Sequence, residues 1–122
     1  MRLEHGMYAR TKNNGICRIT GFASSLTEDY IETEKGALIP TDEILKASHS
    51  LVGNDKEPCL IESGDFVNGS EANFIEYEFI YWKTGHAIHY TYIETILTKE
   101  QYEKIAYKVG EYNEKIANEN KA

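Results

Sequence analysis

The chain has 122 residues, 41% of them hydrophobic and 27% charged, and its formal net charge is −7. This length and composition fit one compact domain, or two very small units that share a core. No apolar run approaches the roughly 18 residues that a membrane-spanning helix needs, and the N-terminus lacks the apolar stretch of a secretory signal. Cys17 and Cys59 show no CxxC or zinc spacing, so we expect reduced thiols, no cofactor and a cytoplasmic protein.

The negative charge lies mainly in the second half of the chain. Residues 1–50 carry six basic and seven acidic side chains, whereas residues 51–122 carry seven lysines and thirteen acids. Because phosphate contacts supply most non-specific affinity for nucleic acids, a chain this acidic is a poor general binder of DNA or RNA. The negative charge favours binding to a partner protein with a basic surface, or it only keeps the protein soluble.

Alternating side chains and turn signals predict a β-rich first half. The expected strands cover residues 7–11, 16–22, 30–33, 37–39 and 46–51. Asn13-Asn14-Gly15, between the first two strands, is a strong signal for a hairpin turn. Pro40 ends the second hairpin, and we expect Thr41 to cap a single helical turn over residues 41–45.

After a break at Gly53–Pro58, the second half predicts three further strands. They cover residues 65–67, 74–82 and 86–93. The longest of them alternates so regularly that one uninterrupted strand is expected. Its first face would carry Ile75, Tyr77, Phe79 and Tyr81. Its second face would carry Glu76 and Glu78.

The last predicted element is a helix over residues 98–118. Thr98 and Gln101 match a capping box, in which each side chain bonds the backbone N–H of the other residue. Apolar residues then recur at spacings of three and four as one narrow seam: Tyr102, Ile105, Val109, Tyr112 and Ile116. The seam either packs on the protein's own sheet or joins two copies in a homodimer.

The chain repeats itself, which indicates a duplicated structural unit. Leu3–Ala9 is echoed by Ile61–Val67, and Ile39–Leu45 is echoed by Tyr92–Leu97. The Gly-x-aromatic opening of each half resembles that of SH3-like barrels, in which five short strands end with one helical turn. We therefore predict a mainly β (β-rich α+β) fold in one compact domain, with two SH3-like units and a C-terminal α-helix: residues 1–50, 51–97 and 98–118. The alternative is a single curved sheet wrapped around the helix.

The sequence contains few residues that point to catalysis or metal binding. His86 and His89 would point to opposite faces of a strand, so they cannot easily bind one metal ion. Glu76 and Glu78 could form an acid–base pair, but carboxylates on a strand face are usually solvated, and we expect a protein without enzymatic activity. An alternative site on the first hairpin combines one aromatic ring with three cations that could bind a nucleotide: Tyr8, Arg10, Lys12 and Arg18.

Five segments follow one another in an order that resembles one protein family: Gly6–Lys12, Gly15–Ile19, Ile44–His49, Leu60–Gly69 and Ile93–Tyr102. The family consists of small uncharacterised proteins carried by phages and prophages of Gram-positive bacteria. Gly53–Cys59 and Ser70–Asn73 depart from its pattern. The resemblance implies a phage-encoded protein, but it implies no particular activity.

These observations support three hypotheses about function. The first is a phage-encoded inhibitor of a host defence protein, similar to an anti-CRISPR protein, whose acidic residues cover a basic groove: Glu71, Glu76, Glu78 and Glu94. The second is a nucleic-acid or signalling-nucleotide binder that uses the patch on the first hairpin. The third is an oligomeric structural or assembly factor that uses the helix seam. We favour the first.

Overall fold

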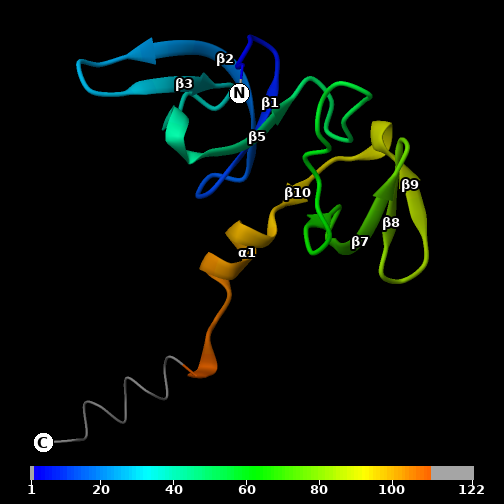
Figure 1. The fold of residues 1–122 in the computed structure, drawn as a ribbon. Coiled ribbons are helices and arrows are strands. Elements are labelled where there is room, and N and C mark those ends of the chain that lie inside the picture. The colour runs from blue at the N-terminus through cyan, green and yellow to red at the C-terminus, as the bar shows by residue number, and fades with distance from the viewer. Residues whose placement is uncertain (1, 111–122) are drawn as a thin grey trace, which may run out of the picture.

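The computed structural model describes residues 2–110 and contains two five-stranded antiparallel sheets and one short α-helix, so the predicted mainly β class is confirmed (Figure 1). The first sheet contains β1 (Tyr8–Thr11), β2 (Ile16–Ser24), β3 (Asp29–Thr33), β4 (Leu38–Pro40) and β5 (Ile44–Ser48). The second sheet contains β6 (Phe66–Val67), β7 (Ser70–Glu76), β8 (Phe79–Trp82), β9 (Ala87–His89) and β10 (Ile96–Leu97). The helix α1 covers Lys99–Ile105 and lies below the junction of the two sheets in the view of Figure 1.

Both sheets have the same strand order, β4-β3-β2-β1-β5 and β9-β8-β7-β6-β10. In each sheet four strands form a meander, and the fifth returns beside the first after a 3-10 turn, η1 (Thr41–Glu43) or η2 (Tyr90–Tyr92). Pro40, and not Thr41, precedes η1 and no side chain caps the turn, so the predicted cap is wrong. Among residues 2–110 the pairings leave β4, β5, β9 and β10 as outer strands, so hydrogen bonding closes neither sheet into a barrel.

The first repeated segment marks the same structural position in both halves. Gly6 (φ +83°) and Gly64 (φ +96°) adopt a left-handed conformation, which glycine tolerates, shortly before β1 and β6. For the second repeat, the sequence aligns Ile39–Leu45 with Tyr92–Leu97, but the structure shifts this alignment. Ile44 and Ile93 each follow a 3-10 turn directly, so Ile44 corresponds to Ile93 and not to Ile96.

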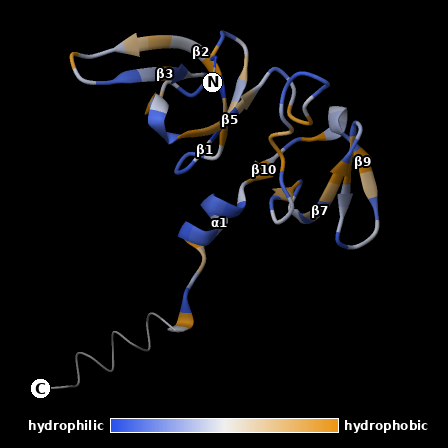
Figure 2. Cartoon of the chain, in the orientation of Figure 1, coloured by the Kyte–Doolittle hydropathy of each residue, from blue (hydrophilic) through white to orange (hydrophobic). Residues whose placement is uncertain are grey.

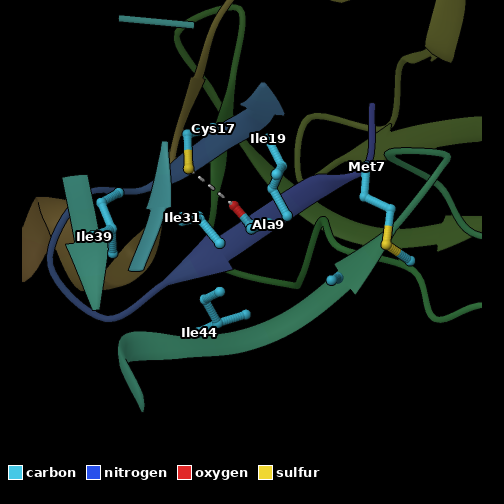
Figure 3. Close-up of a cluster of buried hydrophobic side chains, with 8 residues drawn as sticks. Met7, Ala9, Cys17, Ile19, Ile31, Ile39 and Ile44 are labelled. Carbon is cyan, nitrogen blue, oxygen red and sulfur yellow. Dashed lines mark hydrogen bonds between the residues drawn. The ribbon is translucent and has the colours of Figure 1, made fainter. Parts of the chain in front are cut away.

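Two clusters of buried aliphatic side chains form the core, one for each sheet. The first cluster contains Met7, Ala9, Cys17, Ile19, Ile31, Ile39, Ile44 and Ala47 (Figure 3). The second cluster contains Val52, Ile61, Val67, Ala72 and Ile80. Because successive side chains of a strand point to opposite faces, each sheet buries one face in its cluster. The opposite face of each sheet is therefore the more exposed one.

The uninterrupted strand predicted for residues 74–82 is wrong. β7 and β8 are instead joined by a two-residue turn at Tyr77 and Glu78. Tyr77 has a φ of +57°, a left-handed conformation that bulky side chains rarely adopt. The turn reverses the chain, so Phe79 comes to lie directly beside Glu76 on the neighbouring strand.

The C-terminal helix is shorter than the sequence predicts. Its capping box is confirmed, because the Thr98 hydroxyl accepts a hydrogen bond from the Gln101 N–H and the Gln101 side chain accepts one from the Thr98 N–H. The helix ends at Ile105, however, because Ala106 has an extended backbone. No helix within residues 2–110 is long and apolar enough to cross a membrane.

Candidate functional site

A buried ion cluster joins the two halves of the chain. The Arg10 side chain is 0% exposed and donates to both carboxylate oxygens of Asp65, at 2.6 and 2.8 Å. It also donates to the Leu60 carbonyl at 2.9 Å and to Glu100 of α1 at 2.5 Å. The planar, fork-shaped guanidinium group suits such bidentate pairing. Strand β1, the segment before β6 and helix α1 therefore meet at a single side chain.

Two lysines and a second carboxylate complete the cluster. Asp65 accepts further hydrogen bonds from the backbone N–H groups of Glu62 and Lys99, at 2.7 and 2.9 Å. The Glu62 carboxylate lies 2.8 Å from Lys46 Nζ and 2.7 Å from Lys99 Nζ. Burial would raise the pKa of Glu62, but hydrogen bonds from both lysines and the charge of Arg10 lower it to about 2. Every buried side-chain nitrogen or oxygen in residues 2–110 has a hydrogen-bond partner, so this cluster is a structural joint.

The nucleotide patch predicted on the first hairpin is wrong at Arg10. Tyr8 and Arg10 lie on the same face of β1, but the second half of the chain and α1 cover this face at Arg10. Lys12 and Arg18 are exposed, and the Arg18 guanidinium lies 5.5 Å from the centroid of the Tyr8 ring. The patch therefore offers two accessible cations, and one of them already stacks on its aromatic ring.

The second sheet carries aromatic rings on the face opposite its core. Cross-strand pairing aligns two rows of side chains across β7, β8 and β9 on this face. We name these six residues the aromatic face: Phe74, Tyr81 and Ala87 in one row, and Glu76, Phe79 and His89 in the other. Between the two rows, Ile75, Ile80 and Ile88 point to the core. The aromatic face is thus a consequence of regular strand alternation after the turn at Tyr77.

The rings of the aromatic face are ordered against one another and remain accessible. Phe74 and Tyr81 are stacked, with centroids 4.6 Å apart and an interplanar angle of 10°. Phe79 meets His89 edge-on, with centroids 5.2 Å apart. Phe74 and Phe79 are 45% and 43% exposed. Clustered, exposed rings at a sheet surface are typical of an interaction site, because burying them against a partner is favourable.

The four glutamates predicted to bind a partner do not form one cluster. Glu76 lies within the aromatic face and forms no side-chain hydrogen bond or ion pair with any residue from 2 to 110. Glu78 lies in the adjoining turn, where its carboxylate is 2.9 Å from Nε2 of His89. Glu71, near the other end of β7, is paired with a lysine after β8. Glu94 lies between η2 and β10. Of the four glutamates, only Glu76 belongs to the aromatic face, and only Glu78 lies next to it, through its contact with His89.

An open cleft of about 1370 Å³ is a second candidate binding site. It is lined by β5, by the loop at residues 52–58 and by the turn between β7 and β8. Tyr77 contributes to its lining and is 87% exposed. On its wall, Nδ1 of His49 lies 2.9 Å from Glu57 and Nε2 lies 3.3 Å from Glu4. The cleft is lined by charges of both signs, so its electrostatics favour neither an anionic nor a cationic ligand.

Within the described residues there is no metal site, and neither cysteine is activated. No group of three or more His, Cys, Asp or Glu side chains in residues 2–110 could hold a metal ion. Burial raises the pKa of Cys17 to about 11 and also raises the pKa of Cys59. Both thiols are therefore protonated near neutral pH, which makes them poor nucleophiles.

The continuous seam predicted on the C-terminal helix is wrong. Tyr102 packs on Phe66 of the protein's own sheet, with ring centroids 5.0 Å apart. Ile105 is the last residue of α1, and non-helical residues 106–108 separate it from Val109, where the chain is helical again, so the stripe is interrupted. Figure 2 shows α1 as mostly hydrophilic. The last two members of the seam lie outside the described residues: Tyr112 and Ile116.

No family model, no curated protein and no solved structure matches the chain. The resemblance to phage-borne proteins therefore stays a prediction from the sequence. Among the surfaces that the two sheets present, the aromatic face combines exposed rings with a carboxylate that has no ion-pair partner in residues 2–110.

Proposed function

We propose that this protein is a non-enzymatic binding protein that attaches to a basic surface of a partner protein through its second sheet. The observation that carries the proposal is the position of Glu76, an exposed carboxylate among aromatic rings without an ion-pair partner in residues 2–110. A partner that brings a cation to Glu76 gains an ion pair and buries the rings beside it. Glu78 and the net charge of −7 add long-range attraction to a basic surface.

The role proposed for this binding is inhibition of a host defence protein in the bacterial cytoplasm. Support comes from the resemblance to proteins of phages and prophages and from the small size of the chain. Many defence proteins must hold nucleic acid in a basic groove, because phosphate contacts supply much of nucleic-acid affinity. An acidic protein that occupies such a groove would block it without any chemical step.

Affinity capture tests the proposal. The tagged full-length chain is incubated with nuclease-treated lysate of a Gram-positive bacterium at low and at moderate salt, and the retained proteins are identified by mass spectrometry. The same capture is repeated with Glu76→Lys plus Glu78→Lys. The matched control, Glu32→Lys plus Asp42→Lys, makes the same charge change at exposed positions of the first half.

The proposal expects one stoichiometric partner that moderate salt releases, because screening weakens attraction between exposed charges. The wild-type chain and the control should retain this partner, and the Glu76→Lys, Glu78→Lys variant should lose it. A partner retained equally by all three proteins, or one that resists salt, would contradict binding through the second sheet.

A further inference from the structure

We infer that the aromatic face recognises arginine side chains of the partner, in preference to lysine side chains. This inference rests on the proposed function, which supplies the basic partner. It adds the chemical identity of the recognised group and the residues that select it.

The aromatic face offers stacking positions next to an unpaired acceptor. Phe74 and Phe79 are each nearly half exposed, which leaves ring surface for a planar group beside the rings that already contact them, Tyr81 and His89. Phe74 and Glu76 are two residues apart on β7, and Phe79 is directly opposite Glu76 on β8. Directly opposite residues have Cβ atoms about 4.5–5.5 Å apart, which places the Glu76 carboxylate within reach of a cation stacked on Phe79. The ring can contact the flat face of a guanidinium group, and the carboxylate can accept hydrogen bonds from its N–H donors.

The shape of the face favours a planar cation over a spherical one. A guanidinium group is flat, weakly hydrated and able to donate two parallel hydrogen bonds to a carboxylate while its plane lies on an aromatic ring. An ammonium group is compact and strongly hydrated, so it loses more hydration when it contacts a ring, and it cannot donate two parallel, coplanar hydrogen bonds to a carboxylate. The rings of the aromatic face stand in two neighbouring rows on one side of the sheet, beside the carboxylate of Glu76, so a planar cation can contact a ring and the carboxylate together.

The protein contains an example of the proposed contact on its first sheet. Arg18 lies over the ring of Tyr8, with its guanidinium carbon 5.5 Å from the ring centroid. The two residues are a cross-strand pair of β1 and β2, just as Glu76 and Phe79 are a pair of β7 and β8. On the second sheet the rings are present without an arginine, because all three arginines of the chain lie in the first half. The partner would supply the missing cation.

The test compares two fluorescently labelled peptides of equal length, one oligoarginine and one oligolysine, titrated with the full-length protein and followed by fluorescence anisotropy. Three variants are measured beside the wild type. Phe74→Leu removes an aromatic ring from the face, and Glu76→Gln removes the charge at nearly constant shape. Phe22→Leu is the matched control, because Phe22 is 46% exposed on the first sheet. Near-ultraviolet circular dichroism verifies that each variant is folded.

The inference expects tighter binding of oligoarginine than of oligolysine, because each peptide has the same charge but only one has planar cations. Phe74→Leu should weaken oligoarginine binding by about two- to fivefold, the effect of losing one exposed cation–aromatic contact. Its effect on oligolysine should be smaller, and Phe22→Leu should change neither peptide. Glu76→Gln should weaken the binding of both peptides.

Two other outcomes separate the inference from the proposed function. If both peptides bind equally and only Glu76→Gln weakens them, the preference for arginine is overturned while acidic binding of a basic partner stands. If neither peptide binds even at low salt, the proposed function fails and the inference fails with it. Equal effects of Phe74→Leu and Phe22→Leu would also overturn the inference, because the aromatic face would then be no different from any exposed ring.

Discussion

The buried joint between the two halves makes a quantitative prediction for the substitution Asp65→Asn. The Asp65 carboxylate accepts four hydrogen bonds, two from Arg10 and two from the backbone N–H groups of Glu62 and Lys99. Asparagine has nearly the same shape, but it lacks the charge and turns one acceptor oxygen into a donor NH2 group. Each oxygen of Asp65 accepts two of the four bonds, so two donors lose their acceptor in a buried site.

The expected loss of stability is large for a protein of this size. Removing one partner of a buried ion pair typically costs 3–5 kcal/mol, and Arg10 retains Glu100 as a partly compensating acceptor, so we expect a loss of about 3 kcal/mol. Since whole domains are stable by only about 5–15 kcal/mol, this loss removes a substantial part of the folding free energy. The variant should still fold in water, with a clearly lower urea midpoint.

Urea unfolding measures this loss directly. Circular dichroism follows both sheets, and the fluorescence of Trp82, the only tryptophan, follows the second sheet. The matched control is Glu71→Gln, which removes an exposed ion pair and should cost at most about 1 kcal/mol. Combining Asp65→Leu with Arg10→Met should restore part of the stability, because both members of the fully buried ion pair are then removed together and only the part-buried Glu100 loses its partner. A loss for Asp65→Asn no larger than that of the control would refute the interpretation of Arg10 as the joint.

Three further changes test local features of the fold. Gly53→Ala should lose about 1–3 kcal/mol, because its Cβ would lie 2.6 Å from the Cys59 backbone nitrogen, whereas Gly36→Ala, also at positive φ but in open space, should lose about 1 kcal/mol. Equal urea midpoints for the two glycine variants would contradict this contact. Because the pKa of Glu62 falls from 4.5 to about 2 on folding, its stabilising contribution is present above that ordinary value and is lost as the pH falls to about 2. The stability difference between the wild type and Glu62→Gln should therefore shrink over this pH range in urea titrations, and a constant difference would show that the ion pairs do not form. Thr98→Ala should lower the free energy of unfolding by about 0.5–2 kcal/mol through loss of the N-cap, and an unchanged thermal midpoint would rule out a stabilising capping box.

Much of the fold could be predicted because its signals are local. Alternation of side chains and the Asn13-Asn14-Gly15 turn located β1 and β2, and the repeated segment around Gly6 and Gly64 indicated a duplicated unit. Thr98 and Gln101 predicted the start of α1 because a capping box depends only on neighbouring residues. These features need no knowledge of distant contacts.

The turn at Tyr77 could not be predicted from turn chemistry. Neither Tyr77 nor Glu78 is a glycine, asparagine, aspartate or proline, the residues that usually mark a tight turn. The alternation of residues 74–82 continues straight through them, so periodicity favoured one long strand. The error moved Phe79 and Tyr81 to the wrong face, and the aromatic face was missed for that reason.

The burial of Arg10 depends on partners far away in the sequence. Asp65 and Glu100 are separated from Arg10 by 55 and 90 residues. The sequence around β1 alone therefore predicts that Arg10 is an exposed cation. One signal was available, because the repeat aligns the buried Met7 of the first half with Asp65 of the second. An acid at a core position requires a buried cation. The helix seam failed similarly, since its spacing contains no sign that α1 ends at Ile105.

Binding through the second sheet is tested most directly by a heteronuclear NMR titration of the isotopically labelled, full-length protein with the oligoarginine peptide. We predict that the largest chemical-shift changes map to β7, β8 and β9 around Phe74, Glu76 and Phe79, and that they diminish as salt is added. Changes centred on β5 and the loop at residues 52–58 would assign binding to the cleft instead. That result would contradict the claim that the second sheet is the binding surface of this protein.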